Sequence, residues 1–268
     1  MSVQVTPTLV REKVRESEVL SEIYSLIEED QEVQALLRMS NVMAVGRLLY
    51  NDHGPVHARI IAGSALEIFD RLLESGVTPS TLSEGTLESV DEAKAVVLLA
   101  AFLHDIGNSV HRDNHELIGA IMSERIIDRI VSRVFPDWST RKKVFFKSEV
   151  MHAIYATAPN VRALTVEAGA VKVADATDMA EGRARIPYLK GKLDMHSLSA
   201  ISIKQVLISK GSMRPVRIEV KMLSYAGFFQ VERVLLPKIE TSVIREYVEI
   251  APYIIGKEGE EPLQLMFP

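Results

Sequence analysis

The chain has 268 residues, of which 47% are hydrophobic and 25% are charged, and it contains seven His and no Cys. This composition is typical of a globular chain and excludes disordered, collagen-like and disulfide-scaffold proteins. Without Cys there is no thiolate nucleophile, no disulfide and no Cys-ligated zinc or iron–sulfur site, so any metal chemistry must use nitrogen and oxygen ligands.

The formal net charge is −5. We do not expect such a chain to bind long nucleic acids by broad electrostatic attraction, although a local basic patch is compatible with it. The longest apolar run, residues 95–103, is far shorter than the roughly 20 residues that span a bilayer, and the N-terminus lacks the apolar core of a signal peptide. We therefore expect a cytoplasmic protein that does not bind membranes.

Apolar residues recur at helical spacing as far as about residue 205. Residues 18–49 predict two amphipathic helices, because apolar positions at three- and four-residue steps are interrupted by an acidic run. Pro55 is placed to begin a third helix, which Gly76 and Pro79 would end. Further helices are expected near residues 91–105, 114–134, 139–156 and 166–181. The first of these contains residues 95–103, which are apolar on every face and predict a central buried helix.

The pattern changes after about residue 208. Apolar residues alternate with polar ones from Val216 to Met222, and a second apolar run covers residues 229–236, which together predict a β-hairpin. A short helix near 240–246 and a strand near 247–254 would complete a small α+β unit. We predict a mainly α fold in three parts: N-terminal helices at 1–49 that pack on the core, a helical domain at 50–205, and an α+β appendage at 206–268.

His104 and Asp105 stand at the end of the predicted central helix. Burying such an ionisable pair is costly unless something compensates its charge or satisfies its lone pairs. A divalent cation would do both, with His as a nitrogen donor and Asp as an oxygen donor that is able to bridge two ions. The alternative is a capped helix end with His104 hydrogen-bonded to the backbone, and the pair alone does not separate the two interpretations.

Other candidate ligands stand beside apolar residues on four separate predicted helices. They are His57, His115, His152 and Asp175. Each alone is a weak signal, because a His on an apolar face is more often a hydrogen-bonded core residue, and Asp175 could instead cap its helix or pair with Lys172. Together with the His-Asp pair they favour a metal centre of nitrogen and oxygen ligands.

These residues resemble the HD-domain superfamily of metal-dependent phosphohydrolases, whose signature runs His, His-Asp, often two further His, and Asp. The segment LLAAFLHDIGN is similar to the His-Asp motif, NHELIGA to the following His-x-x-x-Gly helix of ribonuclease Y and related HD proteins, and VKVADATDMAEGRARIP to the terminal Ala-Asp motif with its basic tail. The resemblance covers roughly residues 50–200 and is strongest to an archaeal-type HD phosphatase and phosphodiesterase group. It implies that residues 50–205 form an HD-domain helical bundle.

The resemblance also implies a binuclear centre that holds two divalent transition-metal ions, with Mn, Fe, Co, Ni and Zn all compatible with such ligands. The first ion would be held by His57, His104, Asp105 and Asp175, and the second by Asp105 as a bridge together with His115 and His152. A metal-bridging hydroxide, oriented by Asp105, would then attack the phosphorus of a phosphate ester.

Arg183 and Arg185 follow Asp175 in a basic segment that continues to Lys190 and Lys192. Arginine binds phosphate oxygens in a bidentate fashion, so we expect Arg183 or Arg185 to hold the non-reacting oxygens of the substrate. The alternative is a basic loop that faces solvent.

The remaining histidines carry less specific expectations. His111 precedes the helix predicted to carry His115, so we expect it beside the ligands or in contact with substrate, with direct metal ligation as the alternative. His111 or His196 would protonate the leaving group. His53, in Asn-Asp-His-Gly-Pro, is expected to be a turn residue, and Gly107 a helix C-cap.

We therefore expect hydrolysis of a phosphomonoester, a phosphodiester or a nucleotide, with a small phosphate ester as the substrate and a homodimer compatible with the sequence. Two alternatives from other classes stay open. One is a di-iron oxygenase of HD-like fold, which would consume oxygen when reduced and loaded with iron. The other is a regulatory module that binds metal or nucleotide tightly without turnover.

Overall fold

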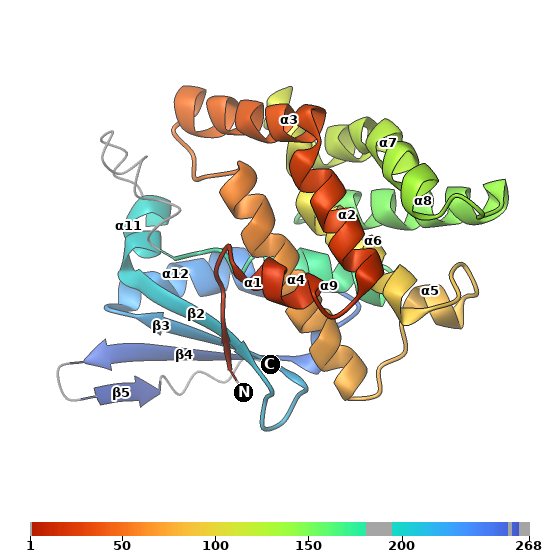
Figure 1. The fold of residues 1–268 in the computed structure, drawn as a ribbon. Coiled ribbons are helices and arrows are strands. Elements are labelled where there is room, and N and C mark those ends of the chain that lie inside the picture. The colour runs from red at the N-terminus through yellow and green to blue at the C-terminus, as the bar shows by residue number, and fades with distance from the viewer. Residues whose placement is uncertain (1, 181–194, 257–258, 263–268) are drawn as a thin grey trace.

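The computed structural model describes residues 2–180, 195–256 and 259–262. In Figure 1, helices from the first part of the chain lie above a sheet that the last part forms together with the N-terminal strand. The helices are α1 (Leu9–Val14), α2 (Glu18–Glu29), α3 (Gln31–Asn41), η1 (Val42–Arg47), α4 (Pro55–Glu74), α5 (Ser80–Ser83), α6 (Val90–Leu103), η2 (Ile106–Ser109), α7 (His115–Val134), α8 (Thr140–Tyr155), α9 (Val166–Asp175), α11 (Met195–Ser202), η3 (Tyr225–Gly227), α12 (Phe228–Gln230), η4 (Val231–Leu235), α13 (Leu236–Glu240) and η5 (Arg245–Tyr247). The strands are β1 (Val3–Gln4), β2 (Ile203–Ser209), β3 (Val216–Met222), β4 (Val248–Gly256) and β5 (Gly259–Pro262).

The helices predicted from apolar spacing are present, except that the one expected at 166–181 ends at Asp175. Side-chain caps fix where several of them begin. Helix α4 begins at Pro55, as predicted. The hydroxyl oxygens of Ser89, Ser139 and Thr165 accept backbone N–H groups in the first turns of α6, α8 and α9. The predicted mainly α fold with a small α+β unit is confirmed.

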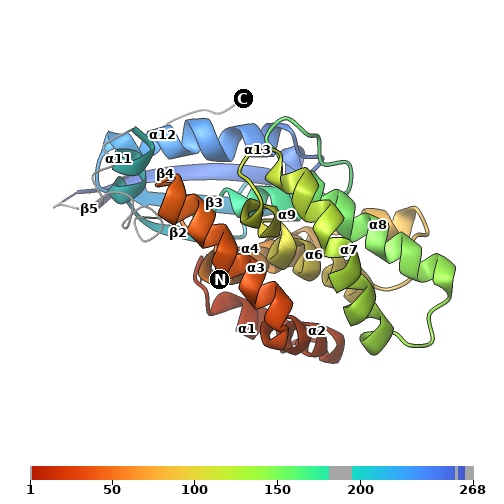
Figure 2. The ribbon, with the colours of Figure 1, turned by 90° about the horizontal axis from the view of Figure 1, so that it is seen from above.

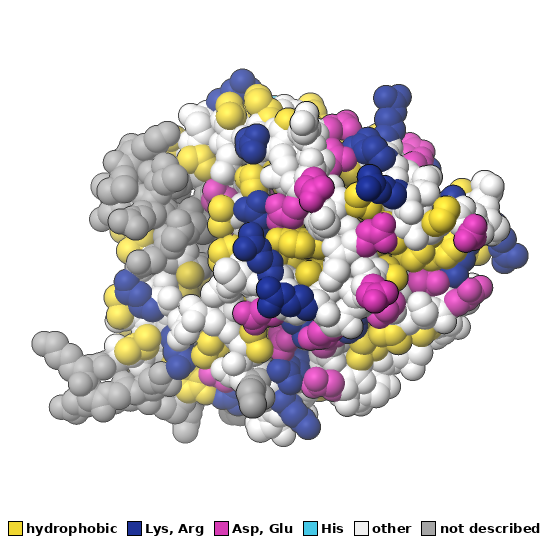
Figure 3. All heavy atoms as spheres, in the orientation of Figure 1, with side chains coloured by type: hydrophobic (Ala, Val, Ile, Leu, Met, Phe, Trp, Pro, Cys, Tyr) yellow, Lys and Arg dark blue, Asp and Glu magenta, His cyan; other side chains and the backbone are white. Residues whose placement is uncertain are grey.

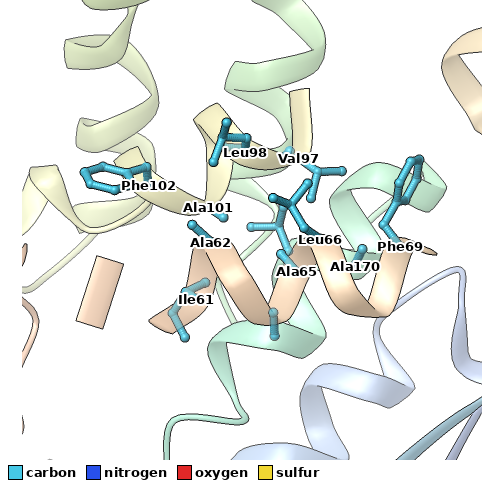
Figure 4. Packing of buried hydrophobic residues seen from close by; sticks show 14 of the residues in the cluster. Ile61, Ala62, Ala65, Leu66, Phe69, Val97, Leu98, Ala101, Phe102 and Ala170 are labelled. Carbon is cyan, nitrogen blue, oxygen red and sulfur yellow. The ribbon is translucent and has the colours of Figure 1, made fainter. Parts of the chain in front are cut away.

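Helix α6 is the central helix of this part of the molecule. Every side chain from Ala95 to Leu103 is fully buried. The helix packs against α2, α4, α8 and α9 (Figure 2). Figure 4 shows Ala62 and Leu66 of α4 in one buried cluster with Val97 and Ala101 of α6, and the small Ala side chains let the two helices approach closely. The C-terminal end of α6 is therefore held deep inside the protein.

The sheet has the strand order β1-β2-β3-β4-β5 among the described residues. Strands β2 and β3 pair antiparallel, whereas β3 and β4 pair in parallel, with Val216 opposite Val248. In β3 the side chains of Val216, Ile218 and Val220 are fully buried and alternate with partly exposed polar ones. This alternation confirms the prediction of a strand at residues 216–222.

The prediction of a second hairpin strand at residues 229–236 is wrong, because residues 228–240 are helical. The buried hydrophobic positions in this stretch are Val231, Leu235 and Ile239, which recur at four-residue steps and form one face of a helix. Parallel strands need a crossover connection, usually a helix, and this segment is the crossover between β3 and β4. The local two-residue alternation misled the sequence interpretation.

The N-terminal residues also take part in the sheet. Val3 of β1 lies opposite Ile208 of β2 in an antiparallel pair. The N-terminal part is therefore joined to the appendage by backbone hydrogen bonds as well as to the helical core. The division of the chain into three parts stays a prediction.

Charged side chains of both signs are interspersed on the face of the molecule shown in Figure 3. This mixture agrees with the modest net charge of −5. Among the described residues, no helix combines the length and the apolar character needed to cross a bilayer.

One buried cation, Lys172 of α9, does not make the ion pair with Asp175 that the sequence left open. Its side chain is fully buried, and its ammonium group donates hydrogen bonds to the backbone carbonyls of Ala158 and Val161 instead of pairing with Asp175 or facing solvent. Burial, together with the nearby charge of Lys238, lowers the pKa of Lys172 to about 8. The residue thus joins the turn after α8 to the middle of α9.

We expect Lys172 to make folding stability depend on pH above neutrality. Its pKa is about 8 in the folded protein and ordinarily 10.5, so between these values the unfolded chain holds a proton that the folded chain has released. Stability therefore rises with pH across this range, and Lys172→Met removes the rise. Between these pH values the free energy of unfolding of the wild type should rise by up to about 3 kcal/mol more than that of the variant, since one pKa unit corresponds to about 1.4 kcal/mol.

Urea unfolding at several pH values between 7.5 and 10.5 checks this. The exposed Lys210→Met is the control, and its stability should run parallel to that of the wild type. Parallel curves for Lys172→Met and the wild type would contradict the prediction.

Candidate metal centre

Two histidines and two aspartates from three helices converge at the buried end of α6. His57 lies in the first turn of α4, His104 and Asp105 directly follow α6, and Asp175 is the last residue of α9. The Nε2 atom of His57 is 3.3 Å from Asp105 Oδ2 and 3.3 Å from Asp175 Oδ1. The Nε2 atom of His104 is 3.4 Å from each of the same two oxygens.

Hydrogen bonds at Nδ1 turn the Nε2 atom of each imidazole toward Asp105 and Asp175. His104 Nδ1 is 2.8 Å from the carbonyl oxygen of Ala101, and His57 Nδ1 is 2.7 Å from Asp178 Oδ2. A carbonyl and an ionised carboxylate only accept hydrogen bonds, so each Nδ1 carries a proton and donates it. Each Nε2 is thereby turned toward two carboxylate oxygens, and that of His104 is buried.

Both carboxylates are ionised in this environment. Burial alone would raise the pKa of Asp105, but His53 and His104 hold it well below its usual range. Burial acts in the same direction on Asp175, and Lys238 with His104 likewise keeps its pKa well below the ordinary value. The site therefore offers two imidazole Nε2 atoms and two carboxylate oxygens as potential metal ligands.

The donor spacing fits one transition-metal ion. Atoms bound to one ion at about 2.1 Å stand about 3.0–3.4 Å apart for bond angles between 90 and 109°, and the cross distances here are 3.3 and 3.4 Å. Among the described residues, His57, His104 and Asp175 form one group of potential ligands whose donor atoms lie within 4.8 Å, and His53, His57 and Asp105 form another. His57 belongs to both groups.

Comparison with known proteins agrees with this geometry. Residues 41–180 match the HD domain family. The chain belongs to the HD-domain family. It is also 42% identical over 241 residues, 90% of each chain, to the uncharacterized protein MJ1020 of Methanocaldococcus jannaschii. No solved structure matches it.

A loop histidine that sequence reasoning set aside belongs to this HD-domain site. His53 is buried, and its Nδ1 lies 2.6 Å from Asp105 Oδ2. Because a carboxylate only accepts, His53 donates this hydrogen bond and orients the oxygen that also faces the ring of His57. The prediction of a turn residue away from the site is corrected here. A signal was present in the four-residue spacing of His53 and His57, which Gly54-Pro55 obscured.

His115 approaches Asp105 from the opposite side. Its Nε2 is 3.3 Å from Asp105 Oδ1, and this oxygen also accepts a hydrogen bond of 2.8 Å from the side-chain amide of Asn108. Burial would lower the pKa of His115, but hydrogen bonds with Asp105 and Glu116 raise it to about 9. Arg112 lies beside this ring, with Nη1 3.1 Å from His115 Nε2.

Gly107 permits this approach, and it is not the helix C-cap that the sequence predicted. It lies within η2, and a Cβ added to it would be 2.0 Å from the carbonyl oxygen of His115 and 2.6 Å from the nitrogen of Gly119. The backbones of η2 and α7 therefore cross where neither Gly107 nor Gly119 carries a side chain. This close crossing brings His115 next to Asp105.

The structure does not bring His152 into the HD-domain site. Its Nε2 accepts a hydrogen bond of 3.2 Å from the backbone N–H of Leu164, just before α9 begins. Asp175 ends α9, and a ten-residue helix is about 15 Å long, so His152 and Asp175 lie at opposite ends of it. Burial lowers the pKa of His152. The set of second-site ligands implied by the family resemblance is therefore incomplete.

The residues predicted to act on the substrate have less support in the described part of the chain. The side chain of His111 is 58% exposed, and its Nδ1 accepts the backbone N–H of Asp113. Arg183 and Arg185 lie outside the described residues. His196 belongs to α11, but its side chain is outside the described part.

Two side chains that were not predicted from the sequence contact the candidate ligands, although each lies far along the chain from the ligand that it contacts. Asp178 contacts His57, and Lys238 of α13 forms an ion pair with Asp175 Oδ2. Asp178 follows Asp175 by three residues, which is a usable signal for a partner on the same side of the chain. Lys238 follows the apolar run Leu235-Leu236-Pro237, and only the folded chain shows its contact with Asp175.

We expect Gly107→Ala to destabilise the protein strongly. Its added methyl group would overlap the backbone of α7, and overpacking of this kind costs about 1–3 kcal/mol or more. Gly46→Ala is the matched control, because nothing lies within 4 Å of the Cβ added there. Urea unfolding of both variants measures the difference, and equal midpoints would show that η2 and α7 are not closely packed.

We expect Asp178→Ala to weaken metal binding without unfolding the protein. The variant removes the acceptor that fixes His57 Nδ1 as the protonated nitrogen, and loss of such a partner typically costs 10–100-fold in metal affinity, an effect of about that size here. Competition with a chelating dye gives the affinity for Zn²⁺ or Mn²⁺. Asp113→Ala is the control, since that side chain is 84% exposed, and equal affinities in the two variants would rule out the role of Asp178.

Proposed function

We propose that this protein hydrolyses phosphate esters with a divalent transition-metal ion held by His57, His104, Asp105 and Asp175. The observation that carries the proposal is that two imidazole Nε2 atoms face two ionised carboxylates at 3.3–3.4 Å in the protein interior. This donor set and this spacing suit a divalent transition-metal ion. Membership of the HD-domain family, which is commonly hydrolytic, supports the same conclusion.

The protein holds the four donors rigidly before any ion binds. Asp178 and the carbonyl of Ala101 fix the two rings in the tautomer that points Nε2 at the site. His53 holds Asp105 Oδ2, and Ser40 of α3 donates a hydrogen bond of 3.0 Å to the backbone carbonyl of Asp105. When bound, a metal ion here would polarise a phosphoryl oxygen and acidify a water molecule.

We infer one ion rather than the two that the family resemblance implied. The donors on the Oδ2 side of Asp105 are complete, whereas the Oδ1 side has His115 without His152. Mixed imidazole and carboxylate ligands suit Mn, Fe, Co, Ni and Zn better than Ca. The incomplete second set also gives no support to a di-iron oxygenase.

The substrate class follows from the chemistry of the centre and stays broad. A phosphomonoester, a phosphodiester and a nucleotide all present phosphorus to the same ligands. Binding of the non-reacting oxygens by Arg183 or Arg185, and protonation of the leaving group by His111 or His196, stay predictions. We propose a small phosphate ester as the substrate.

Metal analysis and a hydrolysis assay test the proposal together. We expect the purified wild type to bind about one equivalent of transition metal and to hydrolyse 4-nitrophenyl phosphate or bis(4-nitrophenyl) phosphate with at least one of Mn²⁺, Co²⁺, Ni²⁺ and Zn²⁺. Asp105→Asn should lose most of the metal and the activity, because it removes the anionic ligand between the imidazoles.

The control is Asp128→Asn, which changes a carboxylate in a surface ion pair with Lys147. Circular dichroism confirms that both variants are folded. A wild type that hydrolyses these esters equally well after removal of metal by a chelator would overturn the proposal, and so would full activity in Asp105→Asn.

A further inference from the structure

Asp105 faces two different chemical environments with its two oxygens. Oδ2 lies among His53, His57 and His104, at 2.6, 3.3 and 3.4 Å. Oδ1 instead accepts the amide of Asn108. Oδ2 thus faces the three imidazoles of the candidate metal site, whereas Oδ1 faces the amide of Asn108 and the ring of His115.

Arg112 supplies the positive charge on the Oδ1 side. It lies in the loop between η2 and α7, and its Nη1 is 3.1 Å from His115 Nε2 and 3.1 Å from Asn108 Oδ1. Among residues 2–180, 195–256 and 259–262, no carboxylate lies within 4.0 Å of the guanidinium. Arg112 is only partly buried, so its remaining N–H groups are placed to meet a ligand that enters from solvent.

This side of Asp105 is poorly suited to a second cation. The potential metal ligands there are Asp105 Oδ1 and His115 Nε2, and both atoms already take part in hydrogen bonds, the oxygen with Asn108 and the nitrogen with Arg112. A metal ion bound there would also lie close to the guanidinium charge of Arg112, and two positive charges a few ångströms apart in a partly buried site repel strongly. An anion, in contrast, would be attracted by the guanidinium.

In binuclear phosphohydrolases the second ion offsets negative charge on the phosphoryl oxygens. A guanidinium performs the same task, because its planar N–H groups match two phosphate oxygens and its charge is permanent. The distances around His115 put this group on the side of Asp105 where a second ion would otherwise lie.

We propose that Arg112 binds a non-bridging phosphoryl oxygen of the substrate and takes the place of a second metal ion, so that the centre is mononuclear. This inference rests on the proposed function, since it describes how the same site holds the phosphate. Asn108 is the positioning residue, because it contacts Arg112 with its carbonyl oxygen and Asp105 with its amide.

The test uses the full-length protein loaded with Mn²⁺ or Zn²⁺ and inorganic phosphate as the probe. We expect Arg112→Ala to keep about one metal ion per chain, whereas its Kd for phosphate rises about 10-fold or more, as expected for loss of a hydrogen bond to a charged group. Arg112→Lys should fall between the two proteins. The control is Arg162→Ala, which changes an exposed arginine and should leave the Kd as in the wild type.

Chemical rescue separates a direct role from a merely structural one. Added guanidinium, at concentrations too low to unfold the protein, should partly restore the hydrolysis of 4-nitrophenyl phosphate by Arg112→Ala and should not stimulate the wild type. An unchanged phosphate Kd in Arg112→Ala, or two metal ions bound per wild-type chain, would overturn the inference. A wild type that binds no metal would instead overturn the proposed function, so the two failures are distinguishable.

Discussion

The site depends on an electrostatic constraint at the buried end of α6. Two imidazoles donate their Nδ1 protons away from the centre, to Ala101 and Asp178. Their Nε2 atoms therefore face ionised carboxylates in the protein interior, where unpaired charge is costly. The packing that places α6 in the middle of the helices holds these groups together, so the fold itself presents the donor atoms that a cation would bind. Family membership and donor geometry thus agree on a metal centre.

Much of this could be predicted from the sequence, because the relevant signals are local. The run Ala95–Leu103 is apolar on every face, and a helix of that kind must be central. His104 and Asp105 follow it directly, so the sequence predicts that both side chains are buried and that burying their charges costs free energy. His57 and Asp175 stand on amphipathic helices whose apolar faces point to the same core, which explains why the ligand set came together as expected.

The parts that could not be predicted depend on geometry between distant segments. His152 has the same apolar neighbours as a ligand would have, but the turn after α8 places it at the beginning of α9, away from Asp175. His53 was missed because a Gly-Pro pair predicts a turn and does not show which way the turn faces. The ion pair of Lys238 with Asp175 joins residues that no periodic pattern relates. Pairing of β3 with β4 in parallel, which makes residues 228–240 a crossover, is likewise a property of the whole sheet.

The crossover has a consequence for the order in which the protein is assembled. The ligands from His57 to Asp175 leave the ribosome before α13 does, and β1 is synthesised long before Ile208, which pairs with Val3. Until Lys238 arrives, Asp175 lacks the cation that neutralises its outer oxygen. Lys238 and His104 keep the pKa of Asp175 low in the folded protein, so a late segment of the chain completes the charge balance of a centre whose other members precede it.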